Sequence, residues 1–185
     1  KNSYLTLKNI NNNPTRNGIL LALKKMGAKI IFRNQRKNNN EYICDIEVFS
    51  SELNGCDLGP EFADLMIDEY PILSIAASFA NSPSTFRGLK ELRFKESDRL
   101  KLILLNLKNC GVDCKVENDN LYINPSKNYK VNKNIIHTDF DHRIAMSFCV
   151  MGTRVGPITI DNEDSIKTSF PTFKDELNKL GGKIF

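Results

Sequence analysis

The segment DRLKLILLNLKNCGVDC, residues 98–114, carries the pattern that decides the fold. Its apolar residues are spaced to line one face of a helix: Leu100, Ile103, Leu104 and Leu107. Gly111 follows at the position where a left-handed residue ends many helices, and a short strand-like stretch comes next. The segment therefore predicts an amphipathic helix, a glycine cap and a strand.

The same pattern occurs twice more along the chain. Residues 17–26 and 171–180 also predict amphipathic helices, and Gly27 and Gly181 hold the capping position before a short apolar strand. A further strand is expected ahead of each of the three helices, at residues 3–7, 84–89 and 158–161. The chain is therefore built from a repeated unit.

Two apolar helices precede the second and third of these strands. Residues 71–80 (PILSIAASFA) and 143–152 (RIAMSFCVMG) are apolar nearly all round, which predicts interior helices. Residues 113–117 and 120–124 form an expected hairpin with its turn at Asp119-Asn120, and we expect residues 36–40 to be a polar surface loop. The pattern favours an α/β fold of three related units around shared buried helices. The first unit lacks its opening helix, and the third ends as its last strand begins.

Composition is that of an ordinary globular protein, with 41% hydrophobic and 26% charged residues. We find no apolar run long enough for a membrane span and no signal peptide. The first residue is Lys1, so we expect a piece of something longer. The net charge of +4 is mild and scattered, which favours an anionic small molecule over nucleic acid as the partner.

The five cysteines indicate a reducing compartment, the cytoplasm, because their number is odd and no CxxC pair occurs. Cys110 and Cys114 could share a metal ion, but His137 and His142 lack ligand spacing relative to them. We therefore expect buried structural thiols and no metal site.

Two predicted helix starts carry an arginine, although a helix N-terminus is electropositive and disfavours cations. Arg99 follows the expected cap Ser97, and Arg143 follows the expected cap Asp141. An anion bound between the two guanidinium groups and the free backbone N–H groups would explain both. The alternative is a pair of surface salt bridges, to Asp98 and Asp141.

Candidates for proton transfer lie close by in the sequence. Lys95 and Glu96 immediately precede the helix that begins near Arg99, and Asp68 lies just before the apolar helix at residues 71–80. Side chains at the ends of buried helices can have their pKa values shifted by partial desolvation and by nearby cations. For Asp68 taken alone, a simple capping role is the alternative.

Four motifs resemble those of the enolpyruvylshikimate-phosphate synthase (EPSP synthase) family, also called 3-phosphoshikimate 1-carboxyvinyltransferases. They are DEYPILSIAASFA (residues 68–80), LRFKESDRL (92–100), DHRIAMSF (141–148) and TSFPTF (168–173). The resemblance covers essentially the whole chain, in the family's order and spacing. It is closest to the bacterial class with DEYP and TSFP motifs.

The resemblance implies a two-domain clamp, each domain an inverse α/β barrel of three βαβαββ units. Residues 1–185 would be a single C-terminal domain that lacks its first strand and helix, with about two and a half units present. The N-terminal domain would be the missing partner, and the intact enzyme is expected to be a monomer.

By this resemblance, the protein transfers the enolpyruvyl group from phosphoenolpyruvate to the 5-hydroxyl of shikimate 3-phosphate, without a metal or organic cofactor. Asp68 would contact that hydroxyl as a candidate base, Lys95 would lie near it, and Glu96 would protonate the methylene carbon. Phosphoenolpyruvate would bind to Arg99 and Arg143, and glyphosate would compete for the same pocket.

Two residues remain secondary candidates for substrate binding. His142 matches a position beside the family's site. Many members carry a lysine directly before the Ser/Thr-Phe-Pro element, where this chain has Thr168; Lys167, one position earlier, is the candidate in its place. Without the N-terminal half, the chain is expected to have negligible turnover. The alternatives are an isolated, non-catalytic anion-binding module and another member of the enolpyruvyl or RNA-cyclase superfamily.

Overall fold

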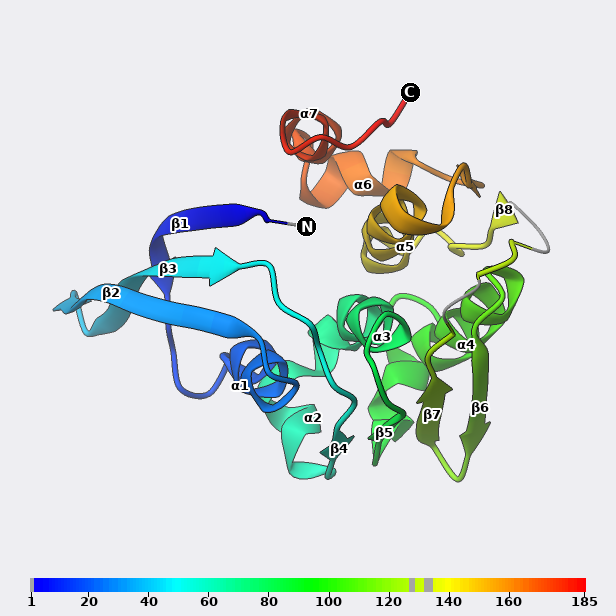
Figure 1. The fold of residues 1–185 in the computed structure, drawn as a ribbon, viewed down its shortest axis with the longest axis horizontal. Helices are drawn as coiled ribbons and strands as arrows, with labels where there is room; N and C mark the ends of the chain where they lie inside the picture. Colours follow the sequence, from blue (N-terminus) through cyan, green and yellow to red (C-terminus); the bar gives the residue numbers. More distant parts are fainter. Residues whose placement is uncertain (1, 127–128, 132–134) are drawn as a thin grey trace.

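The computed structural model describes residues 2–126, 129–131 and 135–185. It contains three separate sheets, of three, four and two strands. Figure 1 shows these sheets at the periphery of the molecule, with helices α3 and α5 between them. Among the described residues, no helix combines the length and apolarity needed to span a bilayer.

In the first unit, strand β1 (Tyr4–Asn11) leads through helix α1 (Gly18–Lys25) into a hairpin of β2 (Lys29–Asn38) and β3 (Glu41–Phe49). Because β1 pairs antiparallel with β3, the sheet order is β1-β3-β2. Strand β2 continues through most of the segment that the sequence predicts as a loop, residues 36–40. That prediction is wrong because only the last two asparagines of the segment adopt the left-handed turn conformation.

The second unit begins with a parallel strand pair. Strand β4 (Asp57–Leu58) pairs with β5 (Ser84–Phe86). Between them the chain forms helix α2 (Glu61–Met66), the 3-10 turn η1 (Ile67–Glu69) and helix α3 (Tyr70–Ser78). Seven of the nine residues of α3 are buried, so the prediction of an interior helix is confirmed there.

The second unit then repeats the plan of the first. A 3-10 segment, η2 (Leu89–Phe94), leads into helix α4 (Arg99–Asn109) and the hairpin of β6 (Asp113–Glu117) and β7 (Asn120–Asn124). The order β5-β7-β6 reproduces β1-β3-β2. The pairing of β5 with β7 is antiparallel, as is that of β1 with β3. The predicted repeat is confirmed, and its full form is βαβαββ. The hairpin turn lies one residue earlier than predicted, at Asn118-Asp119, where both residues have positive φ.

The third unit starts in the same way as the second. Strand β8 (Ile135–Ile136) runs parallel to β9 (Thr159–Ile160), and helix α5 (His142–Val155) joins them. Helices α6 (Asp164–Ser169) and α7 (Phe173–Lys179) follow. The strand predicted after α7 does not form, because the described residues offer it no neighbouring strand to pair with.

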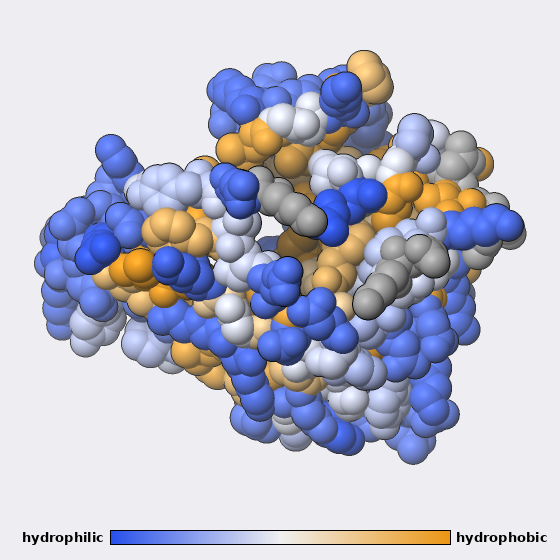
Figure 2. Space-filling view, in the orientation of Figure 1, coloured by the Kyte–Doolittle hydropathy of each residue, from blue (hydrophilic) through white to orange (hydrophobic). Residues whose placement is uncertain are grey.

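Helix α5 is less enclosed than its composition predicts. One face is buried, through Ile144, Ala145, Phe148 and Met151, whereas the opposite face is half-buried beneath α6 or exposed near the C-terminal end. It is therefore an amphipathic helix that packs on α3, not an interior helix all round. Figure 2 shows hydrophilic residues over most of one face of the molecule, with apolar surface gathered beneath α7 and over the first sheet.

All five cysteines are free, as predicted. Four are buried and Cys149 is half-buried, and burial raises the pKa values of Cys110 and Cys149 to about 11. Such thiols are protonated and unreactive at neutral pH. In the described part of the chain, no three His, Cys, Asp or Glu side chains are arranged to hold a metal ion.

The three glycine caps are confirmed. Gly27, Gly111 and Gly181 have φ values of +94°, +80° and +95°. In each case the next residue donates its N–H to the carbonyl five positions earlier, the hydrogen bond that closes a Schellman motif. The shared geometry explains why the same sequence pattern marks each unit.

Two of these glycines provide a matched test of backbone strain and crowding. An alanine Cβ at Gly111 would lie 2.4 Å from the Lys130 carbonyl oxygen, whereas one at Gly181 would meet nothing within 4 Å. We expect Gly181→Ala to cost roughly 1–2 kcal/mol of unfolding free energy through its left-handed backbone. Gly111→Ala should cost an additional ~1–3 kcal/mol through overpacking. Urea unfolding of both variants measures the difference, and equal losses would contradict the crowding.

Candidate active site

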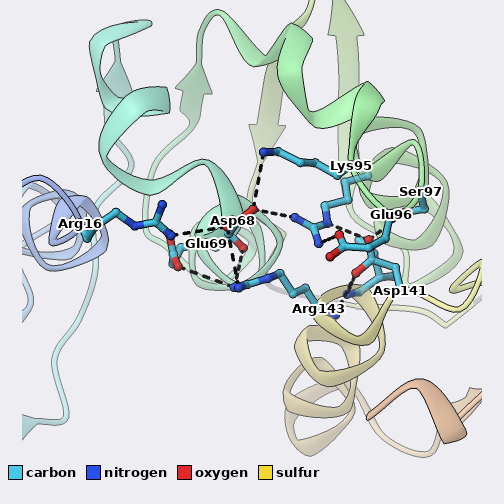
Figure 3. Close-up of polar contacts among 10 residues, drawn as sticks. Arg16, Asp68, Glu69, Lys95, Glu96, Ser97, Asp141 and Arg143 are labelled. Carbon is cyan, nitrogen blue, oxygen red and sulfur yellow. Dashed lines mark hydrogen bonds and ion pairs between the residues drawn. The ribbon is translucent and has the colours of Figure 1, made fainter. Parts of the chain in front are cut away.

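Three segments that are far apart in the sequence meet at one place. Turn η1 contributes Asp68, the connection between η2 and α4 contributes Lys95 and Glu96, and the start of α5 contributes Arg143. Figure 3 shows these side chains pointing toward one another. The repeat explains the meeting, because α3, α4 and α5 pack together and present neighbouring ends.

Arg99, the first residue of α4, lies at the centre of this cluster. Its side chain is only 1% exposed. The Nε atom donates to Asp141 at 2.7 Å, Nη1 donates to Asp68 at 2.9 Å, and Nη2 donates to Glu96. Burial of a guanidinium is costly unless its charge and its hydrogen-bond donors are satisfied. The three carboxylates, on three separate elements, meet that requirement.

Asp141 caps α5, as predicted, and is itself fully buried. One of its oxygens accepts from the backbone N–H groups of Arg143 and Ile144, at 2.9 and 3.4 Å. The other accepts from Ser97 Oγ at 2.9 Å and from Arg99 Nε at 2.7 Å. The predicted anion site included free N–H groups at this helix start. That part is wrong, because Asp141 already occupies the two amides.

The cap of α4 also differs from the prediction. Asp98, not Ser97, is its N-cap, and the Asp98 Oδ1 atom accepts from the backbone N–H of Lys101 at 2.9 Å. Ser97 lies one residue before the cap position, and its hydroxyl donates to Asp141.

Asp68 has four cations around it. Arg16 lies at 3.5 Å, Lys95 at 3.9 Å, Arg99 at 2.9 Å and Arg143 at 3.8 Å from its carboxylate oxygens. Burial alone would raise the pKa of this carboxyl, but Arg143 and Arg99 outweigh burial and hold the pKa below its usual value. Asp68 is therefore ionised at neutral pH.

Glu69, the next residue, is in the opposite situation. Its Oε1 atom lies 3.7 Å from Arg143 Nη1, and its Oε2 atom is buried without a hydrogen-bond partner among the described residues. Burial raises the pKa of Glu69, Arg143 opposes the rise, and the charge of Asp68 adds to it. Two consecutive carboxyl groups thus have pKa values shifted in opposite directions.

The structure brings together the two predicted arginines. Arg99 and Arg143 both contact Asp68, so their guanidinium groups lie on the same side of the molecule. The alternative of two surface salt bridges is wrong: Arg99 pairs with Asp141 in the interior, and Asp98 pairs with Arg93. Each guanidinium nitrogen of Arg99 donates to a carboxylate and the side chain is buried, whereas the side chains of Lys95 and Arg143 are about one-third exposed. Those two cations are open to a ligand. Arg16, whose side chain is 56% exposed, is also open to a ligand.

Two other candidates lie apart from these contacts. His142 begins α5 and is half-buried, and its side chain has no hydrogen bond or ion pair to another described residue. Lys167 is exposed on α6 and pairs with Asp164 at 2.6 Å, and none of its described contacts reaches the cluster.

Sequence reasoning missed Arg16 and Glu69, and it treated Asp141 as a cap or as a partner in a surface salt bridge. The repeat held a signal for Arg16, because this residue stands just before α1 as Arg99 stands at the start of α4. For Glu69 no comparable signal existed, since a carboxylate before a helix is ordinarily a solvated cap.

The fold defined by these units is shared with an enolpyruvyl transferase. The crystal structure of NikO from Streptomyces tendae matches 90% of this chain and 35% of its own, with a TM-score of 0.64 and 16% identity. EPSP synthase from Acinetobacter baumannii matches more closely, with a TM-score of 0.89 and 37% identity over 97% of this chain and 42% of its own.

The chain belongs to the EPSP synthase family, because the model of EPSP synthase (3-phosphoshikimate 1-carboxyvinyltransferase) matches residues 1–177. It is 44% identical to the 3-phosphoshikimate 1-carboxyvinyltransferase of Paramagnetospirillum magneticum and 45% identical to that of a Pseudomonas species. Each match covers 98% of this chain and 41% of the relative. The chain thus spans about two-fifths of the length of these curated relatives.

The opposite pKa shifts lead to a test at Glu69. Its raised pKa means that ionising Glu69 opposes folding above the folded-state pKa and has no effect below the unfolded pKa, about 4.3. Glu69→Gln removes this penalty. We therefore expect the unfolding free energy of the variant, minus that of the wild type, to rise between about pH 4 and pH 7.

Urea unfolding at several pH values measures this difference. Glu91→Gln, at an exposed position on η2, is the control for loss of one surface carboxylate. A difference for Glu69→Gln that stays constant or falls as the pH rises would contradict the assignment.

Proposed function

We propose that residues 1–185 contribute part of the active site of an enzyme that transfers the enolpyruvyl group of phosphoenolpyruvate to the 5-hydroxyl of shikimate 3-phosphate, releasing phosphate. The observation that carries the proposal is the ring of four cations around Asp68. It occurs in a chain 44% identical to enzymes of that name.

Asp68 is the proposed general base. The hydroxyl must lose a proton as its oxygen attacks carbon 2 of phosphoenolpyruvate, and an ionised carboxylate can accept that proton. The surrounding cations keep Asp68 charged, and Lys95, at 3.9 Å, would stabilise the oxygen as negative charge develops on it. A base with a lowered pKa is a weak one, so its strength would increase when an anionic substrate draws the cations toward itself.

Glu96 is the proposed proton donor to carbon 3. Its side chain is 54% exposed, the most accessible of the three carboxylates on Arg99. A proton donor must reach carbon 3, and the contact with Arg99 holds the carboxyl group of Glu96 in place. The proposal therefore requires Glu96 to leave Arg99 when substrate binds, which its exposure permits.

Phosphoenolpyruvate binding is assigned mainly to Arg143, with Lys95 and Arg99 nearby. Among the described residues, the partly exposed Arg143 guanidinium is held by contacts of 3.4 to 3.8 Å, to Asp68 and Glu69. Such long contacts are easily exchanged for a bidentate interaction with a carboxylate or phosphate. We retain His142 and Lys167 as secondary contacts. Lys167 would have to exchange its pair with Asp164.

The remaining substrate groups are proposed to come from a second, N-terminal domain, because the curated relatives extend well beyond the matched region. Closure of the two halves would assemble the site and exclude water. We also propose that the protein works in the cytoplasm, and the five free cysteines support this.

The second candidate function is an anion-binding module without catalysis. The occupied donors of Arg99 and the capped N-terminus of α5 favour it, since both reduce the binding capacity of the chain by itself. Phosphate-release assays with both substrates distinguish the two candidates. The enzyme requires turnover by the complete polypeptide, whereas the module requires phosphoenolpyruvate binding without any turnover.

We expect residues 1–185 alone to release phosphate at less than about a thousandth of the rate of the complete polypeptide, because positioning of both substrates is lost. A coupled phosphate assay at equal protein concentrations measures the ratio. Comparable rates from the two proteins would show that this chain holds the whole site.

Arg143 and Glu96 should give opposite kinetic signatures in the complete polypeptide. Arg143→Ala should raise the KM for phosphoenolpyruvate at least about tenfold, since a charge-assisted contact is worth ~1.5–3 kcal/mol. Glu96→Gln should lower kcat by about two orders of magnitude, in the range of general acid catalysis, with a smaller change in KM. Steady-state kinetics measure both. Unchanged parameters in both variants would mean that the roles are assigned wrongly.

A further inference from the structure

We propose that Asp141 is a positioning residue of the synthase, which holds Arg99 and Arg143 in fixed relation so that both guanidinium groups face one bound anion. This inference rests on the proposed function and deepens it, since Asp141 itself would not touch the substrate. Three features of the structure support the inference: the two oxygens of Asp141 bind different helices, Asp141 is buried, and Asp98 caps a helix without contacting Arg99.

The two carboxylate oxygens of Asp141 hold two different helices. Oδ1 accepts from the backbone N–H groups of Arg143 and Ile144 and so fixes the first turn of α5. Oδ2 accepts from Arg99 Nε at 2.7 Å and so fixes the first side chain of α4. One rigid planar group therefore links the two arginine-bearing helix starts, and Figure 3 shows it beside Ser97 and Arg143.

Burial makes this link rigid. Asp141 has no exposed surface, and Arg99 is 1% exposed by its side chain. In such a site each displaced hydrogen bond leaves an unpaired group in a low-dielectric environment, which strongly disfavours alternative positions. A buried ion pair is weak evidence for stability, because apolar residues of similar volume often serve as well. Its clearest contribution here is geometric.

The other two carboxylates on Arg99 cannot provide a constant anchor. Glu96 must leave Arg99 to act as a proton donor, and Asp68 must turn to the substrate hydroxyl to act as a base. Among the described contacts of the guanidinium, only the one to Asp141 is then kept throughout the reaction. Asp141 is thus the partner that keeps Arg99 in place while the others exchange.

Asp98 shows that capping alone does not require this arrangement. It is the N-cap of α4 as Asp141 is of α5. Yet its side chain is 33% exposed, and its second oxygen contacts Arg93, outside the cluster. Both residues have a capping role, but of the two only Asp141 contacts Arg99.

The test is Asp141→Asn in the complete polypeptide, with Asp98→Asn as the matched control. Asparagine caps helices about as well as aspartate, but its amide cannot neutralise the guanidinium. We expect the KM for phosphoenolpyruvate to rise at least about tenfold while the KM for shikimate 3-phosphate changes less than about twofold. Asp98→Asn should change neither. Equal kinetics for the two variants would overturn the inference.

Two further measurements keep the inference testable if Asp141→Asn does not fold. They also distinguish failure of the positioning role from failure of the proposed function. Ser97→Ala removes one hydrogen bond to Oδ2 without leaving an unpaired charge in the core, and should raise the phosphoenolpyruvate KM about threefold. An unchanged value would overturn the positioning role. If the wild type has no synthase activity, the proposed function fails instead. Hydrogen exchange of the Arg99 Nε–H, followed by 15N NMR, then tests its contact with Asp141. Slow exchange in the wild type that becomes faster in Ser97→Ala supports the positioning role. Fast exchange in the wild type refutes it.

Discussion

The site depends on the burial of one guanidinium. Arg99 lies in the interior at the start of α4, where an unpaired positive charge would cost several kcal/mol. Its charge is balanced by Asp68 from η1, Glu96 from the preceding connection and Asp141 from the start of α5. Three elements that the chain brings from distant positions are thereby held in one arrangement. The charge requirement of Arg99 therefore gives the cluster its shape before any substrate is present.

Neighbouring carboxyl groups acquire different properties in this cluster. Asp68 faces four cations and stays ionised. Glu69 has a buried oxygen without a hydrogen-bond partner among the described residues, and burial raises its pKa although Arg143 and Arg16 oppose the rise. Pairs of titratable groups whose environments push their pKa values apart are characteristic of sites that move protons. Both carboxyl groups also hold Arg143 when no ligand is bound, through long contacts that a ligand can replace.

The repeated βαβαββ unit explains why the cluster forms where it does. Each unit ends its amphipathic helix with the same glycine motif, and the first two units pair their strands in the same order. Helix α5 occupies the position of α3 in its unit, and α4 occupies the position of α1. The starts of α4 and α5 meet beside η1, where Arg99 contacts both Asp68 and Asp141. The fold thus brings together three arginines, one at or near the start of each of α1, α4 and α5.

The sequence by itself determined the repeated unit, its amphipathic helices, the glycine caps and the family, because these depend on local periodicity and on residues close together in the chain. It also identified Asp68, Lys95, Glu96, Arg99 and Arg143 as members of one site. Only the tertiary structure decided that Arg99 is buried among three carboxylates, that Ser97 binds Asp141 and is not a cap, and that Arg16 and Glu69 join the cluster. The reason is physical: hydrogen-bond partners and burial depend on which distant segments pack together, and local patterns do not encode that choice.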